Sequence, residues 1–388
     1  MKQYIPLGNV ISKASVERCG TAQLPILSIT MKDGLVLQDE KFKKRIASAD
    51  TSEYKVIPRG KLVQGIHIDE ANFGIQDVVE KGIVSPAYKV WDVDDTIIYP
   101  KYLETVLRSP RSIAFYRSKL NGSVNRRGRM TDDDFLGMLI PFADYSTQIR
   151  AIDFLGRVKS IIGKQEQQLF ALDNLIKSRF VEMFGDPICN PMNWNTYLLE
   201  DCLAQIDSGK SFVCSDRPRT GNRPAVLKLS AATYGDYRPS ENKALLDDDL
   251  FIEGAEVHSG DLLFTRKNTP ELVGMAAYVQ DTPPKLMMPD LIFRLVPNER
   301  MNAVFLWQLI NCREFRPVIQ GISGGSAKSM SNISKERLGK IKVICPPRIL
   351  QDELIPFIAQ VTKSKSAIQK SLDETQLLFD SLMQEYFG

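Results

Sequence analysis

The stretch from residue 101 to residue 129 concentrates positive charge, because its only acid is Glu104. Arginine makes bidentate contacts with phosphate oxygens and with the edge of guanine. Three of the arginines follow Gly122-Ser123 in a loop-like segment, where backbone amides can reach the same phosphates. The stretch therefore predicts an anion-binding surface, and a solvated basic helix and turn is the simpler alternative. Its basic residues are Lys101, Arg108, Arg111, Arg117, Lys119, Arg126, Arg127 and Arg129.

Two further polar groups occur, one after a strand-like segment and one in a flexible loop just before the second long helical segment. Arg266-Lys267-Asn268-Thr269 comes after DLLFT, and the loop-like stretch GISGGSAKSMSNIS supplies Ser, Lys and Asn. Arg and Asn side chains suit bidentate contacts with guanine and adenine. We therefore take as candidate DNA-binding residues Lys61, Arg111, Arg117, Ser123, Arg126, Arg127, Arg129, Arg266, Lys267, Asn268, Ser326, Lys328 and Asn332.

Two segments have residue types found in catalytic sites, but neither has the required pattern. Asn190-Pro191-Met192-Asn193-Trp194 loosely resembles the Asn-Pro-Pro-aromatic motif of adenine methyltransferases, although the second proline and the spacing are wrong. Asp236 with Glu241-Asn242-Lys243 imitates a nuclease metal site, a pattern that arises readily by chance in so charged a chain. We expect a turn at the first segment and no metal at the second, and a stand-alone nuclease remains the weaker alternative.

Cysteine and histidine give no further chemistry. The six cysteines, which never fall at CxxC spacing, have only His67 and His258 as possible co-ligands, so we expect reduced structural thiols and no metal site. No P-loop, EF-hand or HExxH pattern is present. The absence of catalytic motifs favours a binding scaffold over an enzyme.

Composition indicates an ordinary globular protein of 388 residues, 43% hydrophobic and 25% charged, which is long enough for two or more domains. The net charge of +3 is too small to identify an anionic partner by itself. Because no apolar run approaches 18 residues and no leader is evident, we expect a cytoplasmic protein.

An internal repeat organises the chain. Gln148 aligns with Gln351, Phe154 with Phe357, and Phe184-Gly185 with Phe387-Gly388, all at an offset of 203 residues. The chain is therefore two diverged copies of one unit. We expect Phe184 and Phe387 to occupy equivalent positions about a pseudo-twofold axis.

Each copy ends in a helix with a heptad seam. A helix from about Thr147 to Phe184 would be roughly 55 Å long, and the same register recurs in the second copy. We expect the two helices to pack antiparallel, although two amphipathic helices packed on their own domains remain possible. Gly156, Gly163, Pro356 and Lys365 are the weak points. The seam residues are Val158, Ile162, Leu169, Leu172, Ile176, Val361, Ile368, Leu372, Phe379 and Leu382.

The part of each copy before the helix is β-rich, because runs such as AYKVW and LIFRLV lie between Gly, Pro and Asp. The predicted fold class is α+β, with two repeated β-rich domains separated by two long antiparallel coiled-coil helices. The expected domains are 1–145, a first spacer helix 146–186, a second domain 187–347 and a second spacer helix 348–388.

Three stretches carry a family resemblance, namely TRKNTPELVGMAAYV with MPDLIFRLVPN, NISKERLGKIKVICPPRILQDEL, and FGDPICNPMNW. With the repeat, they make the whole chain similar to the specificity subunit of type I restriction-modification enzymes. The first copy departs from the pattern at Pro141–Tyr145, where the second has Ile344–Arg348 with two prolines. The proline-rich entrance to the helix is thus degraded in the first copy.

The resemblance implies that each β-rich domain is a target-recognition domain that reads one half of a split DNA site. The helices would set the gap between the halves and dock methyltransferase subunits, two per chain, with restriction subunits as further partners. It implies a non-catalytic chain that binds no cofactor, whereas S-adenosylmethionine, ATP and Mg would be used by the partners. The alternative function is a coiled-coil interaction scaffold with incidental basic loops.

Overall fold

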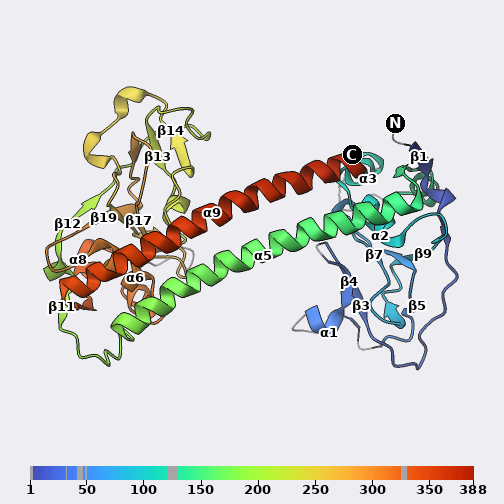
Figure 1. Ribbon diagram of the computed structural model, residues 1–388, viewed down its shortest axis with the longest axis horizontal. Coiled ribbons are helices and arrows are strands. Elements are labelled where there is room, and N and C mark those ends of the chain that lie inside the picture. Colours follow the sequence, from blue (N-terminus) through green and yellow to red (C-terminus); the bar gives the residue numbers. More distant parts are fainter. Residues whose placement is uncertain (1–2, 32, 42–46, 49, 121–129, 325–329) are drawn as a thin grey trace. The chain divides into compact units, whose positions relative to one another are not determined.

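The computed structural model describes residues 3–31, 33–41, 47–48, 50–120, 130–324 and 330–388 (Figure 1). The chain divides into two compact units, which we call unit 1 (Met1–Glu166 with Lys370–Gly388) and unit 2 (Gln167–Gln369). Unit 1 thus combines the first part of the chain with its last segment.

Unit 1 is built on an antiparallel sheet with the strand order β2-β9-β6-β7, accompanied by the two-stranded sheets β1-β10, β3-β4 and β5-β8. Its strands are β1 (Gln3–Pro6), β2 (Ile11–Lys13), β3 (Leu27–Thr30), β4 (Gly34–Leu37), β5 (Lys55–Pro58), β6 (Leu62–Gln64), β7 (Phe73–Ile75), β8 (Lys81–Val84), β9 (Lys89–Val93) and β10 (Leu139–Phe142). Its short helices are α1 (Gln38–Lys41), α2 (Pro100–Leu107), α3 (Pro110–Lys119) and α4 (Asp132–Leu136).

Unit 2 repeats this plan with the antiparallel sheet β12-β19-β15-β17 and the smaller sheets β14-β13-β18, β11-β21 and β16-β20. Its strands are β11 (Thr196–Leu198), β12 (Leu203–Ser208), β13 (Ala225–Leu227), β14 (Asn242–Ala244), β15 (Leu262–Thr265), β16 (Lys267–Asn268), β17 (Ala276–Tyr278), β18 (Leu286–Met287), β19 (Ile292–Pro297), β20 (Ser331–Asn332) and β21 (Lys342–Ile344). Its short helices are α6 (Ala303–Asn311), α7 (Arg316–Gly321) and α8 (Lys335–Gly339).

The two units have corresponding elements. In each, the first strand pairs with the strand that precedes the long helix, as β1 does with β10 and β11 with β21. Two consecutive short helices follow the last strand of the main sheet, α2 and α3 after β9 in unit 1 and α6 and α7 after β19 in unit 2. The predicted α+β class, with two repeated β-rich regions and long helices, is confirmed.

The long helices are α5 (Tyr145–Phe184) and α9 (Arg348–Phe387), each of 40 residues. The helix α5 begins two residues before the expected Thr147, because Asp144 accepts a hydrogen bond from the Thr147 amide at 3.0 Å and so caps the first turn. The side-chain hydrogen bonds from Ser146 and Thr147 hold the pKa of Asp144 well below its usual range. Both helices continue through their expected weak points, Gly156 and Gly163 in α5 and Pro356 in α9.

The long helices run antiparallel within each unit. In unit 1 the first part of α5 packs against the last part of α9, and in unit 2 the last part of α5 packs against the first part of α9. Val158, Ile176, Val361 and Leu382 of the seam are buried. The half-buried seam residues are Ile162, Leu169, Leu172, Ile368, Leu372 and Phe379.

Polar residues in the seam have partners across it. In unit 1, Gln165 Nε2 donates to Ser371 Oγ at 2.9 Å, and in unit 2, Lys365 forms an ion pair with Asp173. The charged Lys365 is thereby accommodated at a seam position. Among the described residues, no helix is both long enough and apolar enough to span a membrane.

Candidate nucleic-acid interface

Strand pairing in unit 2 brings together two of the predicted polar groups. The strand β16 pairs antiparallel with β20, so that Lys267 lies opposite Asn332. Arg266 precedes β16 directly, and its backbone carbonyl accepts a hydrogen bond from the Ile333 amide at 2.8 Å. Residues that are more than sixty positions apart in the chain thus form one cluster, Arg266, Lys267 and Asn332.

Arg266 is held in a defined orientation within this cluster. Its guanidinium lies over the ring of the buried Phe293, 4.8 Å from the ring centroid, and one of its terminal nitrogens donates to Asn332 Oδ1 at 3.2 Å. Its Nε is buried and has no hydrogen-bond partner among the described residues. Because a stacked guanidinium with donors left over is preorganised for a bidentate acceptor, Arg266 suits a phosphate or the edge of guanine.

Two basic residues that we did not predict extend this cluster. Lys335 Nζ lies 5.7 Å from the centroid of the same Phe293 ring. Arg337 packs against Gly324, which pairs with Asn332, so closely that a Cβ at Gly324 would overlap its guanidinium. Both residues belong to α8, which begins after the N-cap Ser334. The only available signal was their place in the segment NISKERLGK, which indicates a helix start rather than a binding surface.

Lys267 and Asn268 are less available than the sequence suggested. Lys267 Nζ lies 3.9 Å from a carboxylate oxygen of Asp290. Asn268 is only 8% exposed, donates to Thr233 Oγ1 at 3.1 Å and accepts from the Thr269 amide at 2.8 Å. The Asn268 amide thus orders the loop and offers no free edge to a base.

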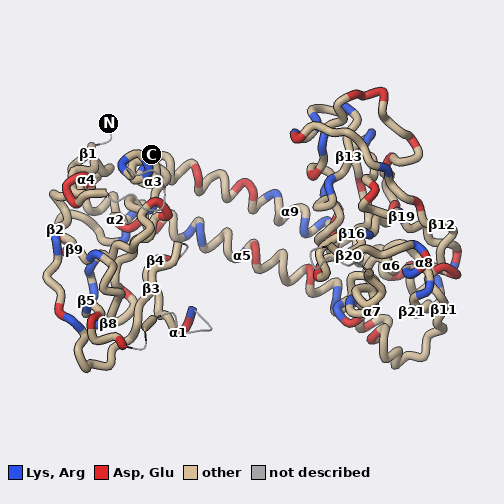
Figure 2. The backbone as a smooth tube through the Cα atoms, turned by 180° about the vertical axis from the view of Figure 1, so that it is seen from behind, with Lys and Arg blue, Asp and Glu red and all other residues tan. Residues whose placement is uncertain are grey.

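In unit 1, acids from other parts of the chain neutralise much of the basic stretch. Lys101 pairs with Asp77 at 2.6 Å, and Lys119 pairs with Asp134 at 3.0 Å. Figure 2 shows basic and acidic positions interleaved over both units. The sequence of this stretch alone suggests a larger positive charge than the folded surface has, because the acids that pair with it lie elsewhere in the chain.

The predicted unit 1 residues have different surroundings. Lys61 forms an ion pair with Asp92. Arg111 lies on α3 with its guanidinium 4.6 Å from the centroid of the Tyr4 ring, and Arg117 is exposed on the same helix. Arg111 and Arg117 are therefore the accessible predicted cations that the structure describes in this unit. Ser123, Arg126, Arg127, Arg129, Ser326 and Lys328 lie outside the described residues.

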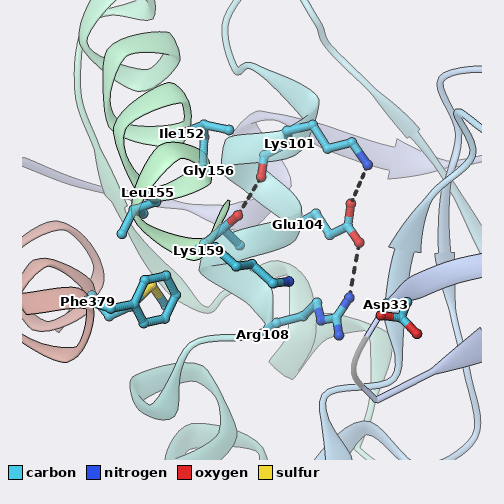
Figure 3. A pocket seen from close by; sticks show the side chains of 11 residues that line it. Asp33, Lys101, Glu104, Arg108, Ile152, Leu155, Gly156, Lys159 and Phe379 are labelled. Carbon is cyan, nitrogen blue, oxygen red and sulfur yellow. Dashed lines mark hydrogen bonds and ion pairs between the residues drawn. The ribbon is translucent and has the colours of Figure 1, made fainter. Parts of the chain in front are cut away.

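Each unit also has a cleft beside its long helices. The unit 1 cleft, of about 460 Å³, lies between α2, α5 and α9, and its wall carries Glu104 between Lys101 and Arg108, with Lys159 pointing toward them (Figure 3). The unit 2 cleft, of about 560 Å³, is lined by α6 at Trp307, Gln308 and Asn311. These α6 positions follow Glu104, Thr105 and Arg108 by the repeat offset, so the clefts correspond although their chemistry differs.

The side chains of the two segments with catalytic residue types have local partners. Asp236 pairs with Arg238 at 2.9 Å, and Glu241 accepts from Ser230 at 2.9 Å. In the described part of the chain, no group of three or more His, Cys, Asp or Glu side chains is arranged to hold a metal. The Asn190 side chain hydrogen-bonds with the backbone of Trp194 at both of its polar atoms, which closes a turn.

Comparison with known proteins supports one family. No protein-family model matches the chain. The specificity subunit of the type I restriction enzyme EcoEI from Escherichia coli is 32% identical over 199 residues, which are 50% of this chain and 33% of that protein. The match thus spans about a third of the length of this curated relative.

Two solved structures have a similar fold over the full length of the chain. A chain from a study of complex assembly and conformational transition of the type I restriction-modification system has a TM-score of 0.56 and 17% identity, covering 100% of this chain and 97% of that one. The type I S subunit from M. genitalium has a TM-score of 0.56 and 11% identity, covering 100% and 96%. At these identities the likeness concerns the fold alone. With sequence identity over half of its length and a shared fold over all of it, the chain is similar to the specificity subunits of type I restriction-modification enzymes.

Proposed function

We propose that this chain is the non-catalytic DNA-specificity subunit of a type I restriction-modification complex. Each β-rich region reads one half of a bipartite site, and the long helices set the gap between the halves. The observation that carries the proposal is the duplication: both units repeat one sheet order and one pair of short helices beside the long helices. Two copies of a recognition region can each bind one half of a split DNA site, and their different loop sequences can recognise two different half-sites.

The proposed DNA contacts in unit 2 are made by Arg266 and Asn332, supported by Lys267, Lys335 and Arg337. Arg266 has a defined orientation and a guanidinium that suits guanine, and the lysines suit phosphates. In unit 1 the proposal rests on Arg111 and Arg117, together with Lys61 if DNA displaces Asp92. The predicted contacts at Ser123, Arg126, Arg127, Arg129, Ser326 and Lys328 remain part of the proposal.

The proposed partners dock on exposed apolar residues that flank the seam. On α5, Phe154 is 43% exposed, Ile161 47% and Leu175 46%, at heptad-compatible spacing; on α9, Leu378 is 46% exposed. Phe154 and Leu175 correspond to Phe357 and Leu378 by the repeat offset. Exposed apolar side chains at this spacing can pack against further helices. We therefore propose that helices of two methyltransferase subunits pack there, one for each copy of the repeat.

The recognition regions are residues 1–145 and 187–347, and the spacers are residues 146–186 and 348–388. Methyltransferase subunits supply the S-adenosylmethionine chemistry, and restriction subunits, where present, use ATP and Mg. This chain itself supplies binding and geometry.

DNA binding by the chain in complex with its methyltransferase tests the proposal. The affinity for a duplex that carries the complex's own methylation motif is compared with that for a scrambled duplex at several salt concentrations. Arg266→Ala should weaken motif binding by roughly ten- to a hundredfold, since a bidentate base contact contributes about 1–3 kcal/mol. Arg313→Ala, at an exposed position of the same unit, is the control.

A coiled-coil scaffold that does not read DNA is the second candidate, which the exposed apolar stripe favours. It predicts equal binding of motif and scrambled duplexes and no effect of Arg266→Ala. That result would reject the DNA-reading proposal.

A further inference from the structure

Two buried glutamines at the starts of the long helices have matching surroundings. Gln148 is the fourth residue of α5, and Gln351 is the fourth residue of α9. Both are 0% exposed. A buried side-chain amide must find partners for its oxygen acceptor and for its two donor hydrogens. Its hydrogen-bond partners therefore show which segments it connects.

In unit 1, Gln148 joins three segments of the chain. Its Oε1 accepts a hydrogen bond from the Tyr99 amide at 2.7 Å. Its Nε2 donates to the Ala143 carbonyl at 2.8 Å and to the Ile97 carbonyl at 3.3 Å. The side chain thus connects the first turn of α5, the connection from β10 and the loop that leads into α2.

In unit 2, Gln351 makes the same three contacts. Its Oε1 accepts from the Asn302 amide at 2.8 Å, and its Nε2 donates to the Pro346 carbonyl at 2.7 Å and the Arg300 carbonyl at 3.0 Å. Every partner lies 203 residues after its counterpart in unit 1. Because these three partner atoms belong to the backbone in both units, the contacts persist although the partner side chains differ.

These contacts fix how each β-rich region is attached to its long helix. The loops that the glutamines hold lead directly into α2 and α6, which carry core residues such as Leu103 and Phe305. A glutamate in the same place would lack the donors, and a methionine would lack both donor and acceptor. The primary amide is therefore required to attach each β-rich region to its long helix, and not only to fill space.

We propose that Gln148 and Gln351 are positioning residues that hold each recognition region at a fixed rotation on its spacer helix, and so restrict the chain to one gap between half-sites. This inference rests on the proposed function. Adding one base pair to the gap moves the next half-site by about 3.4 Å and rotates it by roughly 34°. A stiff joint rejects that displacement, whereas a loosened joint tolerates it.

The test uses the full chain in complex with its methyltransferase. Duplexes carry the complex's own motif with its native gap, or with a gap one base pair shorter or longer. The measured quantity is the ratio of methylation at altered gaps to methylation at the native gap. Gln148→Met and Gln351→Met should each raise this ratio by about tenfold, equivalent to one or two lost hydrogen bonds. Gln168→Met and Gln360→Met, at exposed positions of the same helices, should leave it unchanged.

The ratio does not depend on how much complex is folded, so it separates positioning from stability. If a glutamine variant methylates slowly but keeps the wild-type ratio, the inference is overturned. If the unsubstituted complex methylates no bipartite motif, the proposed function fails instead.

A second measurement uses the unsubstituted chain, so it does not require that the variants assemble. Hydrogen exchange in the unsubstituted chain should show the Tyr99 and Asn302 amides exchanging as slowly as the hydrogen-bonded amides in the interiors of α5 and α9, because the glutamine oxygens are their acceptors. Rapid exchange of either amide would show that the glutamine does not hold the loop at that helix, which would overturn the inference there.

Discussion

Single residues show what sequence patterns can and cannot predict about this site. Arg266 and Asn332 were predictable as polar-loop residues of suitable chemistry, and the structure places them in one cluster. The burial of Asn268 was not predictable, because its partner Thr233 is 35 positions away in an unrelated segment. Lys335 was missed for the same reason, since its position over Phe293 depends on how α8 packs against β19. The residue type predicts which contacts a side chain can make, whereas long-range packing decides whether that side chain is free to make them.

One residue-scale prediction concerns Cys345. A hydrogen bond with Cys202, assisted by the charge of Arg300, lowers the pKa of Cys345 below its usual value, and the pKa of Cys202 is raised by the same contact. The thiolate is the reactive form. Alkylation of Cys345 by iodoacetamide should therefore rise with pH and reach half of its maximum at a lower pH than alkylation of an unperturbed cysteine thiol.

Quantitative peptide mass spectrometry across a pH series measures this reactivity. Cys202→Ala removes the hydrogen bond and should move the midpoint for Cys345 to higher pH. An unchanged midpoint in Cys202→Ala would show that the two thiols are not paired.

Among the elements, the long helices were the most predictable, because a heptad pattern over several turns specifies both helix and buried face. All ten predicted seam residues are buried or half-buried. The start of α5 was less predictable, since Asp144 caps it without the prolines that precede α9. The order of strands in the sheets had no usable sequence signal, because the strands are short and their pairings are distant.

An element-scale prediction follows from the two glycines inside α5. No heavy atom lies within 4 Å of a Cβ built at Gly156 or at Gly163. Since glycine in a helix interior costs roughly 0.5–1 kcal/mol relative to alanine, Gly156→Ala and Gly163→Ala should each increase the free energy of unfolding by about that amount.

Urea unfolding followed by circular dichroism measures this change. Gly34→Ala is the opposite control: Gly34 has φ +73°, and its Cβ would overlap Glu104, so this variant should be less stable. Loss of stability in both α5 variants would show that the helix needs flexibility at these glycines.

At the scale of the whole molecule, the repeat predicted more than the individual elements did. Phe184 packs against Phe305 in unit 2, with 4.8 Å between ring centroids, and Phe387 packs against Tyr102 in unit 1 at 5.3 Å. Tyr102 and Phe305 are themselves related by the repeat offset. Each long helix therefore ends in the core of the unit opposite to the one in which it begins.

A whole-molecule prediction tests whether the end of each long helix stabilises the unit in which it is buried. Phe387→Ala should destabilise unit 1, and Phe184→Ala should destabilise unit 2, each by about 3–5 kcal/mol, because both side chains are fully buried. Phe170→Ala, at a position that is 67% exposed on α5, should change stability by less than about 0.5 kcal/mol.

Hydrogen exchange resolved along the sequence assigns the loss to a unit. Faster exchange in the β-strands of unit 1 after Phe387→Ala, with those of unit 2 unchanged, is the expected result. Equal acceleration in both units would show that the two cores do not respond separately.

The central claim is that this chain selects the DNA sequence that its partner modifies, and genome-wide mapping of adenine methylation tests it most directly. Cells that express the methyltransferase with this chain should methylate one bipartite motif, and deletion of the chain should abolish methylation at that motif. Arg266→Ala should relax the motif in one half-site and leave the other half unchanged. A methylation map that stays the same when the chain is deleted would contradict the account.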